Sequence, residues 1–411
     1  MLIADRSMAE KVANTISNMR IHSRLHHSSI SKLYREQTEC LLQKENELMV
    51  ACTSTMELGI DVGDLDLILQ YNAPNTVSSF LQRLGRTGRR EGKTAHYEFL
   101  IVNKEALLKS IALVELARRQ WVESVHFPLN SYHVLIQQVF SIIRENDGAS
   151  QFQLLQLLKF RQNFSGISKE QFIHLLEEMV SNNYLALVDG KYFLSDKLDE
   201  KFARKNYLEI CSVFETVKEF TVKHQNRDIG SLDSWFVNIY YKENEPFIFV
   251  LNGLVWKGIE IDFNRYIIHV QEAEKGAIPI WQGSGQKISF EIAQQILLIS
   301  SSYEDYPYID QDASRKLKEY RTNFHYFGMK PGMVIIEEDS KGYTIYTFAG
   351  DMVNYTLATL LREYTGAEIK TDYQKVKLKI EDYPYNLLEK YIEKIKYGRS
   401  ILDIKEIYRG Y

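Results

Sequence analysis

Two short phrases between Met49 and Arg90 constrain the fold of this chain more than any other feature. The apolar run Leu48–Ala51 leads into TSTMELGID (Thr53–Asp61), and QRLGRTGRR (Gln82–Arg90) closes a short helical pattern. A strand that ends in a Thr/Ser/Gly loop presents hydroxyls and backbone amides that suit a phosphate. Arginines spaced three apart around glycines can approach a second phosphate closely. The pair of phrases predicts half of a nucleotide site on an α/β lobe.

Composition places the chain among ordinary globular proteins. Its 411 residues predict two or three domains, and 45% hydrophobic with 25% charged residues is a usual balance. No apolar run approaches the roughly 20 residues of a membrane helix, and no signal peptide is evident. Cys40, Cys52 and Cys211 lack CxxC spacing, which excludes a cysteine zinc ribbon and favours a reducing, cytoplasmic setting.

The net charge of −4 is spread evenly along the chain. A basic surface of the kind that dominates many nucleic-acid-binding proteins is therefore absent, so local contacts must hold any nucleic acid.

Residues 1–131 alternate strands with helices, which predicts a parallel sheet in an α/β lobe. The expected strands are Met1–Ala4, Leu48–Cys52, Leu67–Tyr71 and His96–Val102, and the expected helices are Ser7–Met19 and Ser31–Gln43.

Residues 132–205 change to three amphipathic helices followed by a hairpin. Ser168 and Gln171 have capping-box spacing, and Asp189-Gly190 suits a type I′ turn. This order predicts a winged helix that serves in packing, since acidic side chains outnumber basic ones in it.

Residues 206–411 predict a β-rich, barrel-like α+β domain. We expect strands at Val213–Val222, Trp235–Tyr241, Phe247–Leu251, Leu254–Ile261 and Tyr266–Val270, helices at Ser289–Ile299, Ala313–Phe324 and Asn354–Tyr364, and strands at Val334–Glu337, Gly342–Phe348 and Val376–Ile380.

The two opening phrases resemble motifs V and VI of superfamily 2 helicases. The segments MELGIDVGDLDLILQ, NRYIIHVQEAEKGAIPIWQGSG and TFAGDMVNYTLATLLREYTGAEI narrow the resemblance to the large helicase-related (Lhr) proteins. The resemblance implies a second RecA-like lobe, a winged helix and a β-rich domain. It also implies ATP- and Mg²⁺-dependent 3′-to-5′ translocation on single-stranded DNA or a DNA/RNA hybrid.

The chain departs from that family at its start, because the sequence contains no G-x4-G-K-[ST] and no DExH. The nearest approach, Gly88–Thr94, has its glycines one residue too close and follows a helix. We expect a fragment or one half of a split helicase, with ATP and Mg²⁺ held mainly by a first RecA-like lobe supplied from elsewhere. The chain alone is then no ATPase.

By that resemblance, Arg86 and Arg89 stand where arginine fingers stabilise the phosphoryl-transfer transition state. Gln82 takes part in catalysis beside them, and Arg83, Gly59 and Asp61 face the nucleotide. The competing interpretation is a solvated basic turn with ion pairs to Glu91 or Asp66.

Four hydroxyl side chains are predicted to contact nucleic-acid phosphates: Thr53 and Ser54 at the end of a strand, and Ser28 and Ser29 before a helix. The competing role for Thr53 or Ser54 is to cap a helix. Glu57 is expected to make a structural pairing. His26 and His27 lack a third ligand, so no metal site is expected.

Trp256 is predicted to stack on a base of the translocated strand, in the strand LVWKGIEID. Alternation puts Leu254, Trp256 and Gly258 on one face, and the bare glycine leaves room for a planar partner. The alternative is that Trp256 belongs to the core, and its burial decides between the two.

The leading hypothesis is the C-terminal part of an ATP-dependent DNA helicase that works in DNA repair, genome maintenance or defence. It would be cytoplasmic, associated with the nucleoid and independent of membranes. The rival hypothesis is a non-catalytic nucleic-acid-binding scaffold derived from a degenerate helicase.

Overall fold

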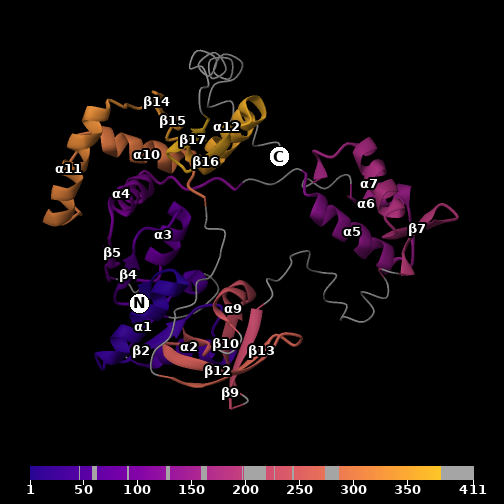
Figure 1. Ribbon diagram of the computed structural model, residues 1–411, viewed down its shortest axis with the longest axis horizontal. Helices are drawn as coiled ribbons and strands as arrows, with labels where there is room; N and C mark the ends of the chain where they lie inside the picture. Colours follow the sequence, from indigo (N-terminus) through magenta and orange to yellow (C-terminus); the bar gives the residue numbers. More distant parts are fainter. Residues whose placement is uncertain are drawn as a thin grey trace. The chain divides into compact units, whose positions relative to one another are not determined.

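The computed structural model (Figure 1) describes residues 1–45, 47–57, 63–89, 92–125, 130–158, 164–196, 198, 219–225, 227–242, 245–273 and 287–380. They form two compact units. Unit 1 combines Met1–Glu123 with Val217–Pro384, and the described part of unit 2 lies within Ser124–Thr216. Within the described residues, no helix is both long and apolar enough to span a membrane.

The first part of unit 1 is a five-stranded parallel sheet in the order β2-β3-β1-β4-β5, here called the lobe. Its strands and helices are β1 (Leu2–Ile3), α1 (Arg6–Asn18), β2 (Ser23–His26), α2 (Lys32–Lys44), β3 (Met49–Cys52), η1 (Ser54–Met56), β4 (Ile68–Tyr71), α3 (Val77–Leu84), β5 (Tyr97–Leu100) and α4 (Lys104–Arg118). Val50, Ala51 and Cys52 are almost fully buried, as expected for an inner parallel strand. The predicted α/β lobe is confirmed, whereas β2 was not predicted because its four residues carry only a short apolar pattern.

A second sheet of unit 1, here called the mixed sheet, has the order β10-β9-β13-β12-β11. Its elements are β9 (Glu219–His224), β10 (Arg227–Asp233), α9 (Ser234–Tyr240), β11 (Ile248–Leu251), β12 (Leu254–Asp262) and β13 (Ile267–Glu272). The predicted strand at Trp235–Tyr241 is wrong. Asp233 Oδ1 accepts from Trp235 N at 2.7 Å and caps a helix there, which overrides the β propensity of the aromatic residues.

The rest of unit 1 packs helices against the lobe. These elements are α10 (Phe290–Ser301), α11 (Gln311–Phe327), β14 (Ile335–Asp339), β15 (Gly342–Tyr346), α12 (Gly350–Thr365), β16 (Glu368–Thr371) and β17 (Lys375–Lys379). Ile292 and Ile296 of α10 share one buried cluster with Leu108 and Ile111 of α4. Helix α4 is therefore covered on more than one side, which explains why its apolar residues follow no single stripe.

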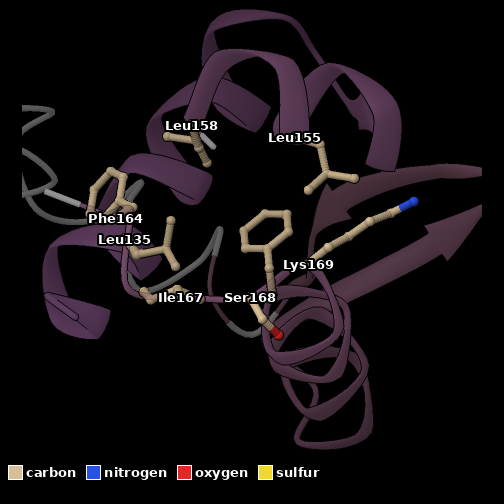
Figure 2. A pocket seen from close by; sticks show the side chains of 8 residues that line it. Leu135, Leu155, Leu158, Phe164, Ile167, Ser168 and Lys169 are labelled. Carbon is tan, nitrogen blue, oxygen red and sulfur yellow. The ribbon is translucent and has the colours of Figure 1, made fainter. Parts of the chain in front are cut away.

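Unit 2 holds α5 (Tyr132–Glu145), β6 (Ala149–Ser150), α6 (Gln151–Leu158), α7 (Lys169–Ser181), β7 (Leu185–Val188) and β8 (Lys191–Leu194), with sheet order β6-β8-β7. Figure 2 shows Leu135, Leu158 and Phe164 converging on its apolar core, while the Lys169 side chain extends away from them. The predicted capping box on Ser168 is present. Asp189 (φ 48°) and Gly190 (φ 76°) form the predicted turn with both residues left-handed.

Candidate nucleotide and nucleic-acid site

A buried ion pair joins the phrase Thr53–Asp61 to the phrase Gln82–Arg90. Arg83 on α3 donates from Nε to Glu57 Oε1 at 2.7 Å, and its Nη2 bonds the same oxygen. Arg83 Nη1 donates to Gln70 on β4, and Ser79 Oγ donates to Glu57 Oε2 at 3.3 Å. Tyr97 on β5 donates to Gln70 Oε1 at 3.1 Å, and burial raises the pKa of that phenol.

This network corrects the prediction for Arg83 and agrees with the structural pairing expected for Glu57. Arg83 is 9% exposed, and all three of its guanidinium nitrogens bond protein oxygens. Arg83 therefore holds Glu57 and Gln70 inside the lobe and does not face a nucleotide. Gln70 and Tyr97 were not predicted from the sequence, because their only signal is a polar side chain within an apolar strand and a tyrosine on the neighbouring strand.

The three predicted catalytic residues lie in the last turn of α3 and in the segment just after it. Arg86 is 8% exposed and donates from Nη2 to the Glu57 carbonyl oxygen. Arg89 is exposed, and its Nε donates to the Gly85 carbonyl at 2.7 Å. Gln82 is exposed on the same helix. The backbone N–H of Leu65 donates to the Arg86 carbonyl at 3.0 Å, which fixes this helix end beside the segment before β4.

The end of β3 presents one exposed hydroxyl. Thr53 is 8% exposed and is the N-cap of the 3₁₀ helix η1, although its side chain makes no capping hydrogen bond. Ser54 is exposed. Because Thr53 is enclosed, the structure leaves Ser54 as the better placed of the two for a phosphate. Gly59 and Asp61 lie outside the described residues.

His26 connects this loop to α2. Its Nδ1 lies 2.8 Å from Thr55 Oγ1, and its Nε2 lies 2.9 Å from Glu39 Oε1. Burial lowers the pKa of His26, and its hydrogen bond to the Glu39 carboxylate opposes that shift. Within the described part of the chain, no cluster of three or more His, Cys, Asp or Glu side chains could hold a metal ion.

Ser28 and Ser29 differ in position. Ser28 is exposed, but Ser29 is 1% exposed, accepts from Arg6 Nη1 at 3.2 Å, and its carbonyl accepts from Ser231 N at 2.6 Å. The phosphate contact predicted for Ser29 is therefore wrong, because its side chain is buried where the lobe meets the mixed sheet. Ser28 keeps the exposure that such a contact needs.

Trp256 belongs to the core of the mixed sheet, which contradicts the predicted base stacking. Its side chain is 3% exposed, Nε1 donates to the Leu251 carbonyl at 2.8 Å, and the His224 ring lies against it at 5.0 Å. The space beside Gly258 is already taken, because a Cβ there would lie 3.2 Å from the Phe247 ring. The bare glycine accommodates a phenylalanine of the same sheet and leaves no slot for a base.

Comparisons with known proteins place these residues in context. The model for the helicase conserved C-terminal domain matches residues 2–91, which include both phrases. The ATP-dependent helicase Lhr-Core of Methanocaldococcus jannaschii is 25% identical over 98% of this chain and 49% of its own length. The Lhr helicase/probable uracil glycosylase of Mycolicibacterium smegmatis is 34% identical over 64% of this chain and 18% of its own.

One solved structure shares the fold over most of the chain. The Mycobacterium smegmatis helicase Lhr bound to ssDNA and AMP-PNP has a TM-score of 0.61 and 19% identity, covering 94% of this chain and 50% of that one. The chain thus spans about half the length of the relatives that it matches along its length. The chain carries a helicase C-terminal domain followed by helical and β-rich parts, and along nearly its whole length it is similar to the Lhr family of superfamily 2 helicases.

Proposed function

We propose that this chain supplies the second RecA-like lobe and the following domains of an ATP-dependent 3′-to-5′ DNA helicase of the Lhr type. The carrying observation is the buried pair between Glu57 and Arg83, inside the segment that matches the helicase model. It joins the loop after β3 to α3 and so brings the Ser54 hydroxyl and the arginines after α3 into one lobe. A degenerate lobe that served only as a scaffold would not need the Ser54 hydroxyl and these arginines to be held together.

The nucleotide side of the proposal rests on the residues at the end of α3. Two guanidinium groups three residues apart fit the negative charge that spreads over a γ-phosphate during transfer. Arg86 is oriented by its bond to the Glu57 carbonyl, and Arg89 is open to an incoming group. Gln82, exposed on the same helix, would contact the nucleotide. ATP and Mg²⁺ would be held mainly by a first RecA-like lobe, and the metal would there supply neutralisation of phosphate charge.

The nucleic-acid side uses exposed hydroxyls of the lobe. Ser54 and Ser28 stay available for phosphate contacts with single-stranded DNA or a DNA/RNA hybrid, whereas Thr53, Ser29 and Trp256 are enclosed. Phosphate contacts position a strand without reading its sequence, as a translocating motor requires.

The proposed function implies a division of the chain into three domains. Residues 1–131 form the helicase lobe and residues 206–411 the β-rich domain. Residues 132–205 form a winged helix, which the order of three helices and a three-stranded sheet in unit 2 supports. A role in DNA repair, genome maintenance or defence is part of the same proposal.

The test combines the purified chain with a first RecA-like lobe from an Lhr relative and measures DNA-stimulated ATP hydrolysis. The chain alone should be inactive, and the mixture active. Arg86→Ala and Arg89→Ala should each lower kcat by about 10²-fold or more, because the arginines act on transition-state charge. Arg118→Ala, an exposed arginine on α4, is the matched control and should leave kcat unchanged. An active mixture that tolerates both substitutions would refute the finger assignment, and a mixture that binds DNA without hydrolysis would favour the scaffold hypothesis.

A further inference from the structure

A fully buried carboxylate outside the predicted site joins parts of the chain that are far apart in sequence. Glu10 on α1 accepts from the backbone N–H of Asn252 at 2.9 Å and of Gly253 at 2.8 Å. The ring of His27, also fully buried, lies with Nε2 2.9 Å from Glu10 Oε1. These four residues are called the Glu10 junction.

The turn between β11 and β12 is shaped for this carboxylate. Asn252 (φ 57°) and Gly253 (φ 71°) are both left-handed, and their successive N–H groups point to the two carboxylate oxygens. A buried carboxylate is tolerated only when hydrogen bonds replace its water. Glu10 is therefore stable in the lobe as long as the mixed sheet stays docked on it.

A second contact fixes the same two parts next to the junction. Ser231 N donates to the Ser29 carbonyl at 2.6 Å, and Ile30 forms an antiparallel bridge with Gly230. Gly230 has φ 154°, and a Cβ there would lie 2.4 Å from the Ser29 oxygen. Only glycine allows the two backbones to approach this closely.

The neighbouring His26 connects the Glu10 junction to the loop at Thr53–Glu57. It bonds Thr55, within η1, while His27 in the next position bonds Glu10. Two consecutive residues at the end of β2 thus contact the loop after β3 and the junction with the mixed sheet.

We propose that Glu10 is a positioning residue that makes the mixed sheet a rigid extension of the lobe, so that movement of the loop at Thr53–Glu57 during ATP turnover moves the sheet as well. The proposal rests on the proposed function. The contact itself is tested on the chain alone, so that its failure is distinguishable from failure of the helicase assignment.

The first experiment measures amide hydrogen exchange on the full chain. Glu10→Gln keeps the side-chain volume but turns one acceptor into a donor facing a backbone N–H. Exchange at Asn252 and Gly253 should rise about tenfold or more, with the interior of β3 unchanged as evidence of folding. Unchanged exchange at the turn would overturn the proposal, because the carboxylate would then not be what holds the sheet.

The second experiment uses the mixture with a first RecA-like lobe. Glu10→Gln should leave DNA-stimulated ATP hydrolysis within about twofold but raise the ATP consumed per base pair unwound by about tenfold. Glu36→Gln, the same change at an exposed position on α2, is the control. Equal loss of hydrolysis and unwinding would mark Glu10 as merely structural. A mixture without any ATPase would refute the helicase assignment, and the coupling role would fall with it.

The third experiment locks the junction. A Cβ at Gly253 would lie 3.9 Å from that of Ala13, within the usual range for a disulfide. The Ala13→Cys/Gly253→Cys protein, with exposed Cys40 changed to Ser, should unwind DNA equally well when oxidised and reduced. If oxidation abolishes unwinding and reduction restores it, the sheet must leave the lobe during turnover, which contradicts the proposal.

Discussion

Two buried carboxylates in the lobe, Glu57 and Glu10, have their charge compensated in different ways. Glu57 pairs with Arg83, a permanent cation 26 residues away in the same lobe. Glu10 bonds a histidine and two peptide N–H groups from a turn more than 240 residues away. The first arrangement fixes the local geometry of the helicase motifs, and the second fastens a distant sheet to them.

The difference shows what each carboxylate depends on. Glu57 keeps its partner as long as the lobe is folded, because the loop after β3 that carries Glu57 and the helix α3 that carries Arg83 both belong to the lobe. Glu10 keeps its partners only while the mixed sheet is docked, so its burial links the stability of two substructures. Loss of a partner should therefore have a local effect at Glu57 and a distributed effect at Glu10.

The largest effect is expected from Arg83→Ala. Removing this partner leaves the Glu57 carboxylate buried without its cation, which typically costs about 3–5 kcal/mol. Urea unfolding followed by tryptophan fluorescence measures this in unit 1, because all four tryptophans lie outside unit 2. The double change Glu57→Gln/Arg83→Met should recover much of the loss. Its failure to do so would show that Arg83 stabilises the lobe through something other than this pair.

A smaller loss is expected from Glu10→Ala. Two buried N–H groups lose their acceptor, but water entering the space left by the side chain can accept from them, so the total loss should be about 2–3 kcal/mol. The same fluorescence measurement applies, and amide exchange should rise across β11 and β12 more than in β3. A loss confined to the lobe would remove the distinction between the two carboxylates.

Next in size is Trp256→Phe, which tests the core of the docked sheet. The substitution removes the indole donor to the Leu251 carbonyl and should cost about 1–3 kcal/mol. Affinity for single-stranded DNA, measured by fluorescence anisotropy at fixed salt, should stay unchanged because the ring is buried. A marked loss of affinity for single-stranded DNA in a protein of normal stability would instead show that Trp256 contacts the nucleic acid.

The smallest effect is expected on the pH dependence of stability and involves His26. This residue bonds Thr55, near Glu57, and is followed in the chain by His27, which bonds Glu10. Burial lowers the pKa of His26 in the folded protein, whereas the unfolded chain binds the proton near the ordinary value of about 6.5. The folded state thus binds fewer protons, so the stabilisation is complete above that value and is lost as pH falls through the lowered folded pKa. The urea midpoint should fall between pH 7 and 5 by more than in His26→Gln. The exposed His174→Gln control should behave like the unchanged protein.

The sequence by itself determined the helicase lobe and most of its elements. Strand and helix periodicity predicted the parallel sheet, and motif spacing predicted that the loop after β3 and the arginines after α3 belong together. These features are local, because a strand end and a helix end need only a few neighbouring residues to specify them. The same locality explains the success at Ser168 and at the Asp189–Gly190 turn.

Only the tertiary structure decided which side chains face solvent. Arg83 and Arg86 share one arginine-rich phrase with Arg89. Of these three only Arg89 is exposed, because Arg83 on α3 bonds the Glu57 carboxylate and Arg86, just after α3, bonds the Glu57 carbonyl. Gly258 suggested an open slot beside Trp256, but Phe247, just before the neighbouring strand β11, fills it. The Glu10 junction depends on Asn252, which lies in a turn 242 residues after Glu10 in the sequence. Burial and long-range partners arise from how elements pack, and no window of sequence contains both sides of such a contact.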